Sequence, residues 1–345
     1  MPKSYLAYVE NIKTSGLSIY DSIKIGDPKL WIPSKDLEAI LNKKLKGLSL
    51  KDLPLRTRSK VVKTAVCQAL GYPVPSSFRK ENPRFPGQNF DTYAQKANNL
   101  QVWNEDLDGT RRYVIIKINV NDEVERVKVV TGETLSFLDT TGTLTQKYQA
   151  RLNIKEAKAE LINDQDTDNI QRMLSKSAQL SSSPIDYPTE RSLYPIKTIF
   201  KKLKLLIGTT FNDPGYDQER NRGSKLHKLI CKSLDYNSYK DDGRFPDICN
   251  QLLEVKLQMS PTIDLGLVCP NSEEIIDFPM VKGHQIRHCD IRYALFYAKT
   301  DGKEVTLTHL YITSGESFFL RFPQFQGKVL NKKIQMHLPN DFFSA

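Results

Sequence analysis

The chain has 345 residues, a formal net charge of +10 and a pI near 9.1. Its length exceeds the ~150 residues of a typical domain and predicts two domains. The excess of Lys and Arg favours an anionic partner such as nucleic acid, although charge alone does not establish one. No apolar run approaches the ~18 residues that span a membrane, and the first residues lack a secretory apolar core, so we expect a cytoplasmic protein with no membrane partner.

Cysteine and histidine usage gives no metal-site pattern. The five cysteines are an odd number without any C-x-x-C pair, which predicts reduced structural thiols. His284, His288 and Cys289 lie close together in the sequence, but a fourth ligand at the usual spacing is missing. We therefore interpret these three as structural residues.

Two helices are predicted in the first quarter of the chain. The segment 34–46 begins at Ser34, a residue type that caps helices, and ends before Gly47, whereas the segment 57–70 ends before Gly71. Two short helices joined by a turn form either a DNA-binding helix-turn-helix or an ordinary basic hairpin. The long connection favours the ordinary hairpin.

The segment 71–104 is rich in Pro, Gly, Asn and aromatic residues and predicts an irregular loop that leads into a short helix. It carries side chains that can donate hydrogen bonds to base edges and phosphates: Arg84, Gln88, Asn89 and Lys96. The runs 111–120 and 123–132 then predict a β-hairpin, and 141–152 a further strand. The first domain is therefore expected to be mixed α+β.

The Ser- and Pro-rich stretch 181–195 predicts a linker. We therefore expect a DNA-recognition or clamping domain over 1–185 and a second domain over 186–345. The segment 195–211 is a basic amphipathic run whose lysines, Lys201 and Lys202 among them, are candidate phosphate contacts. No internal repeat is apparent in the sequence.

The segment 241–261, DDGRFPDICNQLLEVKLQMSP, carries the strongest chemical signal. It predicts a strand with Asp247, a bend near Asn250, and a second strand in which Glu254, Lys256 and Gln258 share one face. The bend can bring Asp247 beside Glu254. An isolated pattern of this kind is more often a salt-bridged surface strand, but here the other face of the strand is apolar.

This residue set fits phosphodiester hydrolysis with Mg²⁺. Two carboxylates can hold the ion, and the main-chain carbonyl of Val255 is a candidate third ligand. The ammonium group of Lys256 can orient the attacking water or stabilise the charge that builds on the phosphate.

The run FPDICNQLLEVKLQ resembles the metal site of the PD-(D/E)xK nuclease superfamily, with a spacing similar to that of the mismatch-repair nicking endonuclease and its type II restriction relatives. The resemblance implies a restriction-endonuclease-like mixed sheet flanked by helices. It also implies that Asp247 and Glu254 bind the metal and that Lys256 is the catalytic lysine. The segment 220–236 resembles the helix that packs beside such a site. That helix commonly offers a further glutamate, but here its candidate positions carry lysines and a histidine, so the extra metal ligand is either missing or comes from Glu219 before the helix. Gln258 is another possible additional site residue.

Two further segments follow the motif. The runs 288–300 and 305–313 predict strands of the same sheet. In the tail, Arg321 and Gln326 have the donor geometry for guanine and adenine edges.

We therefore expect a type II restriction endonuclease that hydrolyses double-stranded DNA at specific sites with Mg²⁺ and acts as a homodimer. No G-x-x-x-x-G-K-[ST] loop is present, so no nucleotide cofactor is expected. One alternative is a nuclease that nicks one strand or acts on damaged or branched DNA. The other is a DNA-binding protein without catalysis.

Overall fold

The computed structural model describes residues 6–103, 107–138, 148–175, 178, 183–215, 219–325, 333–339 and 341–344. The chain divides into two compact units, the first formed by 1–146, 277–280 and 329–345 and the second by 147–276 and 281–328. The division lies near residue 147 and not at 185, because the expected linker packs inside the second unit. No helix in the described ranges is both long and apolar enough to cross a bilayer.

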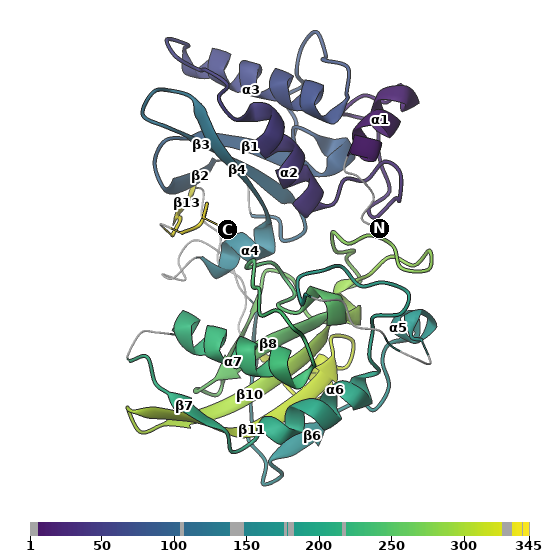
Figure 1. The fold of residues 1–345 in the computed structure, drawn as a ribbon, viewed down its shortest axis with the longest axis vertical. Helices are drawn as coiled ribbons and strands as arrows, with labels where there is room; N and C mark the ends of the chain where they lie inside the picture. The colour runs from purple at the N-terminus through teal and green to yellow at the C-terminus, as the bar shows by residue number, and fades with distance from the viewer. Residues whose placement is uncertain are drawn as a thin grey trace. The chain divides into compact units, whose positions relative to one another are not determined.

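The first unit contains helices packed on a three-stranded sheet (Figure 1). Its helices are α1 (Leu6–Ser15), α2 (Ser34–Leu45), α3 (Leu55–Leu70) and α4 (Gly132–Phe137). Its sheet has the order β1 (Phe90–Gln95), β3 (Arg112–Ile118), β4 (Val124–Thr131), and a separate pair joins β2 (Asn99–Trp103) to β13 (Lys333–His337). Strand β1 is parallel to β3, and β3 and β4 form the predicted antiparallel hairpin.

Two predictions for the first unit were wrong. Helix α2 begins at Ser34 with Pro33 as its N-cap, so Ser34 is not the capping residue. The predicted loop 71–104 contains the short 3₁₀ helix η1 (Pro86–Gln88) followed by strands β1 and β2. The polar residues of β1 concealed this strand, since only its first two residues are fully buried.

The second unit is built on a mixed sheet with the order β6 (Ala159–Leu161), β11 (Glu304–Ser314), β10 (Arg292–Thr300), β8 (Leu253–Gln258), and β7 (Thr210–Asn212) also pairs with β11. A second sheet has the order β12 (Gln324–Phe325), β5 (Tyr148–Arg151), β9 (Thr262–Gly266). The helices are α5 (Asp168–Met173), α6 (Ile196–Leu203) and α7 (Glu219–Ser233), with 3₁₀ helices η2 (Lys204–Leu206), η3 (Cys249–Gln251), η4 (His288–Asp290) and η5 (Phe318–Leu320).

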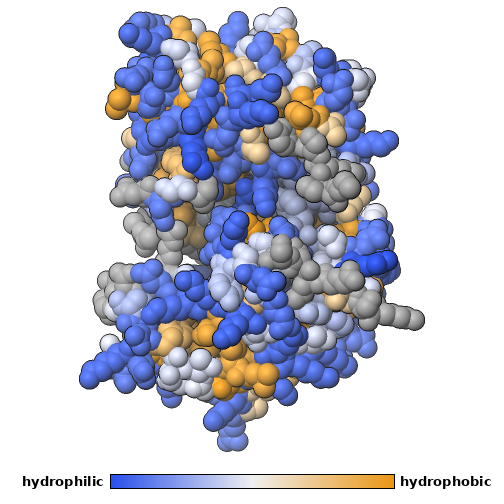
Figure 2. Space-filling model, viewed as in Figure 1, coloured by the Kyte–Doolittle hydropathy of each residue, from blue (hydrophilic) through white to orange (hydrophobic). Residues whose placement is uncertain are grey.

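The core of the second unit lies between α6, α7 and one face of the mixed sheet (Figure 1). Leu253 and Val255 of β8 point to this apolar side, because side chains alternate along a strand. Glu254 and Lys256 therefore point to the opposite face. The mixed α and β composition expected for both parts of the chain is confirmed, and the view in Figure 2 shows a largely hydrophilic surface over both.

The two units repeat one arrangement of elements, which the sequence did not reveal. The order α2, α3, η1, β1, β3, β4 corresponds to α6, α7, η3, β8, β10, β11. In both, the first strand is parallel to the second and the second antiparallel to the third. The packing also repeats, since α2 contacts β4 as α6 contacts β11, and α3 contacts β1 as α7 contacts β8.

The correspondence holds residue by residue at the ends of α3 and α7. The N–H of Tyr72 donates to the carbonyl of Cys67 at 2.9 Å, and the N–H of Tyr236 donates to the carbonyl of Cys231 at 2.9 Å. Each tyrosine follows a left-handed residue that ends its helix. The tyrosine hydroxyl then reaches the 3₁₀ turn. In the first unit the side-chain amide of Gln88 donates to the hydroxyl of Tyr72. In the second unit the hydroxyl of Tyr236 donates to the side chain of Asn250, the residue before Gln251.

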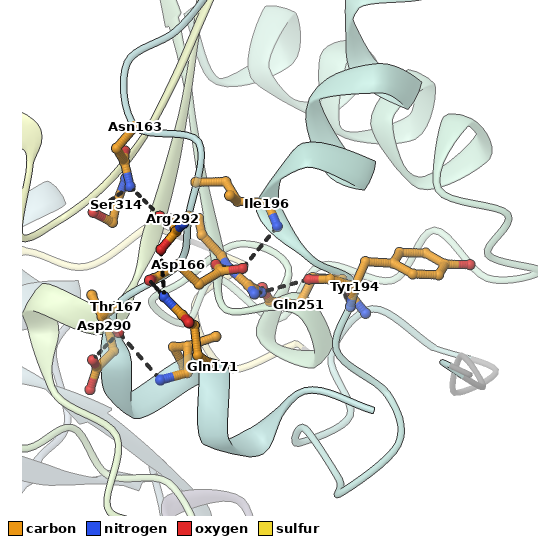
Figure 3. A network of polar contacts seen from close by, with 12 residues as sticks. Asn163, Asp166, Thr167, Gln171, Tyr194, Ile196, Gln251, Asp290, Arg292 and Ser314 are labelled. Atoms are coloured by element: carbon orange, nitrogen blue, oxygen red, sulfur yellow. Dashed lines mark hydrogen bonds and ion pairs between the residues drawn. The ribbon is translucent and has the colours of Figure 1, made fainter. Parts of the chain in front are cut away.

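A buried arginine begins the central strand of each unit. In the second unit, the guanidinium of Arg292 donates to Asp166 (2.6 Å), to the carbonyl of Gln251 (2.7 Å) and to the carbonyl of Tyr194 (2.9 Å) (Figure 3). Asp166 also accepts the first N–H of α6, from Ile196, at 2.9 Å. This network fastens the helix to the sheet.

The first unit builds the same network from different partners. Arg112 donates to the carbonyls of Gln88 and Ile32 and contacts Asp277 at 3.4 Å. Asp277 accepts the first N–H of α2, from Ser34, at 3.0 Å. Asp166 comes before α6 in the chain, whereas Asp277 comes long after α2. The two units therefore share the geometry of this network but not the order of its residues in the sequence.

Candidate active site

The turn before β8 positions the candidate site. Asp247 lies in this turn and not on a strand as predicted, and η3 forms the bend that follows it. A β-bridge between Ile248 and Leu253 closes the turn. Asp247 is thereby placed against the first residues of β8, as the spacing of the motif requires.

The structure brings Asp247, Glu254 and Lys256 together. The main-chain N–H of Asp247 donates to Oε2 of Glu254 at 3.3 Å. Nζ of Lys256 contacts the other carboxylate oxygen of Glu254, Oε1, at 3.1 Å. The side chains of Glu254 and Lys256 are 7% and 12% exposed, so this ion pair is shielded from solvent and is not a surface salt bridge.

The local electrostatics favour a cation between the two carboxylates. Burial raises the pKa of Asp247 well above its usual value, and the neighbouring charge of Glu254 raises it further. The N–H of Val255 and the ammonium of Lys256 oppose this rise. A bound divalent ion would remove the repulsion between the carboxylates, because it supplies the positive charge that both face.

The main chain of Val255 faces the same place. Its N–H donates to Oδ2 of Asp247 at 2.9 Å, and β8 is the edge strand of its sheet. In a strand, the N–H and C=O of one residue point to the same side, so the Val255 carbonyl also points to the open edge. Two carboxylates and one carbonyl are hard oxygen donors of the kind that Mg²⁺ prefers.

Of the two additional residues predicted for the site, the structure describes the side chain of Gln258 but not that of Glu219. Gln258 ends β8, where it is partly exposed and aligned with Tyr297 of β10. Glu219 begins α7, but its side chain lies outside the described residues. Among the described side chains there is no group of three or more His, Cys, Asp or Glu residues able to hold a metal.

The predicted DNA contacts of the first unit fall into different environments. Gln88 is buried, and its amide bonds the main chain at Leu30 and Ile32, so it has a structural role and does not face a base. The side chain of Asn89 bonds the carbonyl of Thr110 at 3.4 Å. Lys96 is half exposed and pairs with a carboxylate. Arg84 is partly exposed in the turn before η1.

The contacts predicted for the second unit are also distributed. Lys201 is exposed on α6, and Lys202 beside it contacts Asp235 at 2.5 Å. Arg321 pairs with Glu160 at 3.0 Å and its side chain is 9% exposed, which makes it a packing residue. Gln326 lies outside the described residues.

The residues that sequence reasoning missed occupy the equivalent place in the first unit. The bridges Phe85–Phe90 and Ile248–Leu253 align the two turns. With this alignment, the positions of Asp247, Glu254 and Lys256 are taken by Arg84, Asp91 and Tyr93. The sequence signals for this were the similar order of residues in VCQALGY and ICKSLDY at the ends of the two helices, and the Arg-Tyr pair that begins each central strand.

Comparisons of the chain with protein-family models, with curated proteins and with solved structures found no match.

Proposed function

We propose that this chain is a Mg²⁺-dependent endonuclease of the type II restriction class that hydrolyses double-stranded DNA. The observation that carries the proposal is the buried meeting of Asp247, Glu254 and Lys256 at the edge of the mixed sheet. The resemblance of this segment to the PD-(D/E)xK superfamily and the net charge of +10 support it. The free cysteines agree with action in the reducing cytoplasm.

Each residue of the site has a role in this proposal. The carboxylates of Asp247 and Glu254, with the carbonyl of Val255, would hold Mg²⁺, and the bound ion would supply the charge that polarises the scissile phosphate and lowers the pKa of a water. Lys256 is held by Glu254 at 3.1 Å. Its ammonium group orients the attacking water or stabilises the negative charge that develops on the phosphate oxygens.

Cleavage of plasmid and phage DNA by the full chain with Mg²⁺ tests this function. Lys256→Ala should lower the cleavage rate by about 10²–10³-fold, because one preorganised charge is removed from the transition state. Lys299→Ala, which changes an exposed lysine at the end of β10, is the matched control and should cut normally. If wild type leaves DNA intact, or if Lys256→Ala cuts as fast as wild type, the proposal is wrong.

A nicking activity is the second candidate, and one observation favours it. The first unit carries Arg84 and Tyr93 where the second carries Asp247 and Lys256, so the repeat does not give one chain a second cutting site. A single chain would therefore cut one strand of the duplex. Cutting both strands at one position would then need two chains, which is the homodimer expected for a palindromic target. Accumulation of nicked circles from a supercoiled plasmid would favour nicking, whereas direct linear product would favour the dimer.

A further inference from the structure

The first unit holds a cationic counterpart of the candidate active site. Asp91 is buried at the position of Glu254, but the partner position carries Arg84 in place of a carboxylate. Tyr93 replaces the catalytic lysine. This place has one carboxylate where the second unit has two, so it lacks the paired donors that a divalent ion needs.

A second cation, Lys63, belongs to α3, which packs against the strand β1 that carries Asp91. Lys63 of α3 is partly buried with its ammonium 4.8 Å from the ring centre of Phe78. Burial lowers the pKa of Lys63, and the nearby guanidinium of Arg84 lowers it further, while Asp91 has the opposite effect. Asp91 offsets part of the repulsion between the two cations, and an anion that contacts both would offset more of it.

The hydrogen bonds leave donors for such an anion. A guanidinium has five N–H groups in a planar fork that matches phosphate. Nη1 of Arg84 bonds the carbonyl of Arg79 at 3.2 Å, which also fixes the direction of the side chain. Arg79 and Lys80 in the same loop are exposed, and one carboxylate, that of Glu81, lies 3.9 Å from Arg79, so the loop around Arg84 keeps an excess of positive charge.

We propose that the first unit binds a phosphodiester of duplex DNA at Arg84 and Lys63, without a metal and without cutting it. This inference rests on the proposed function, because it takes the ligand of the repeated fold to be the same in both units. The repeat then gives one chain a cutting site and a holding site. In the holding site, Arg84 stands at the position of Asp247, so a cation of the protein replaces a carboxylate that would hold the divalent ion in the cutting site.

The test is DNA binding by the full chain in EDTA, measured by the anisotropy of a labelled duplex over a series of salt concentrations. Arg84→Ala should weaken binding about tenfold and lower the slope of log K against log salt by roughly 0.9, the value for one lost phosphate contact. Arg84→Lys should restore most of the slope because it keeps the charge. Lys35→Ala, which removes an exposed lysine of α2, should bind as wild type does.

The outcomes separate this inference from the proposed function. If Arg84→Ala keeps the affinity and salt slope of Lys35→Ala, the holding site is wrong even when wild type cuts DNA. If wild type binds with the predicted dependence on Arg84 but never cuts, the inference on the first unit stands and the nuclease fails. Lys63→Ala, checked for an unchanged melting temperature, should reproduce the loss, and normal binding by that variant would also contradict the proposal.

Discussion

The carboxylate of Asp247 accepts a hydrogen bond from the main-chain N–H of Val255, with 2.9 Å between Oδ2 and N. In the first unit the equivalent N–H, that of Thr92, is bound at 2.8 Å by Asp91, its own neighbour. Both edge strands therefore satisfy the same N–H with a carboxylate. Only in the second unit does the carboxylate come from the preceding turn, so that Glu254, at the position of Asp91, binds the main-chain N–H of Asp247 and the ammonium group of Lys256 instead.

We predict that Mg²⁺ stabilises the protein through the two carboxylates and not through Lys256. A ligand at 100 times its Kd adds about 2.7 kcal/mol to the free energy of unfolding. Lys256→Ala should keep this gain, whereas Glu254→Ala should lose it. Thermal unfolding with and without Mg²⁺ measures the difference, and a full gain in Glu254→Ala would exclude it as a ligand.

In the absence of metal, Asp247→Asn should stabilise the protein at neutral pH. The pKa of Asp247 is raised in the folded state by burial and by Glu254. Its stabilising contribution is thus present at pH values below the unfolded pKa and is lost as pH rises through the folded one. The amide variant avoids this loss, so its advantage over wild type should grow with pH and vanish in acid, as measured by urea unfolding in EDTA.

Buried His288 should make the protein less stable in mild acid. Burial lowers its pKa to about 3, and its ring stacks on Phe245 with 5.2 Å between ring centres. As pH falls from about 6 to about 3, the unfolded state gains a proton that the folded state lacks, at a cost of up to about 1.4 kcal/mol per pH unit. His288→Gln should flatten this part of the profile, and the exposed His337→Gln should leave it unchanged.

The buried pair Arg292 and Asp166 should be sensitive to loss of one partner. Both side chains are at most 2% exposed, so Arg292→Met leaves an unpaired buried carboxylate and should cost about 3–5 kcal/mol. Adding Asp166→Asn to that variant should recover part of the loss, because no buried charge remains. Urea denaturation of the two variants measures this, and equal stability of single and double variants would contradict the argument.

Gly223 offers a site for stabilisation. It lies inside α7, and a Cβ added there would have nothing within 4 Å. Gly223→Ala should raise the free energy of unfolding by about 0.5–1 kcal/mol, because alanine loses less backbone entropy in a helix. Gly315→Ala is the contrasting variant, since its Cβ would overlap the carbonyl of Pro270, and it should be destabilised by about 1–3 kcal/mol. Melting temperatures of the two variants measure both effects.

Local patterns in the sequence predicted several elements correctly. Alternating β-formers around Asn121 and Asp122 gave the hairpin of β3 and β4, and Gly71 marked the end of α3. The motif spacing also placed Asp247, Glu254 and Lys256 in one site. These features depend on residues that are near one another in the chain, where periodicity and turn chemistry act directly.

Long-range contacts decided the rest. The repeat of the fold was hidden because its shared network uses Asp166 in one unit and Asp277 in the other, at different places in the sequence order. Burial of Gln88 and the inclusion of the expected linker within the second unit likewise depend on packing between distant segments. The sequence by itself predicted which residues of the second unit meet in the candidate site. Only the tertiary structure decided that Arg84 occupies the equivalent place in the first, because that equivalence is one of backbone geometry and not of residue type.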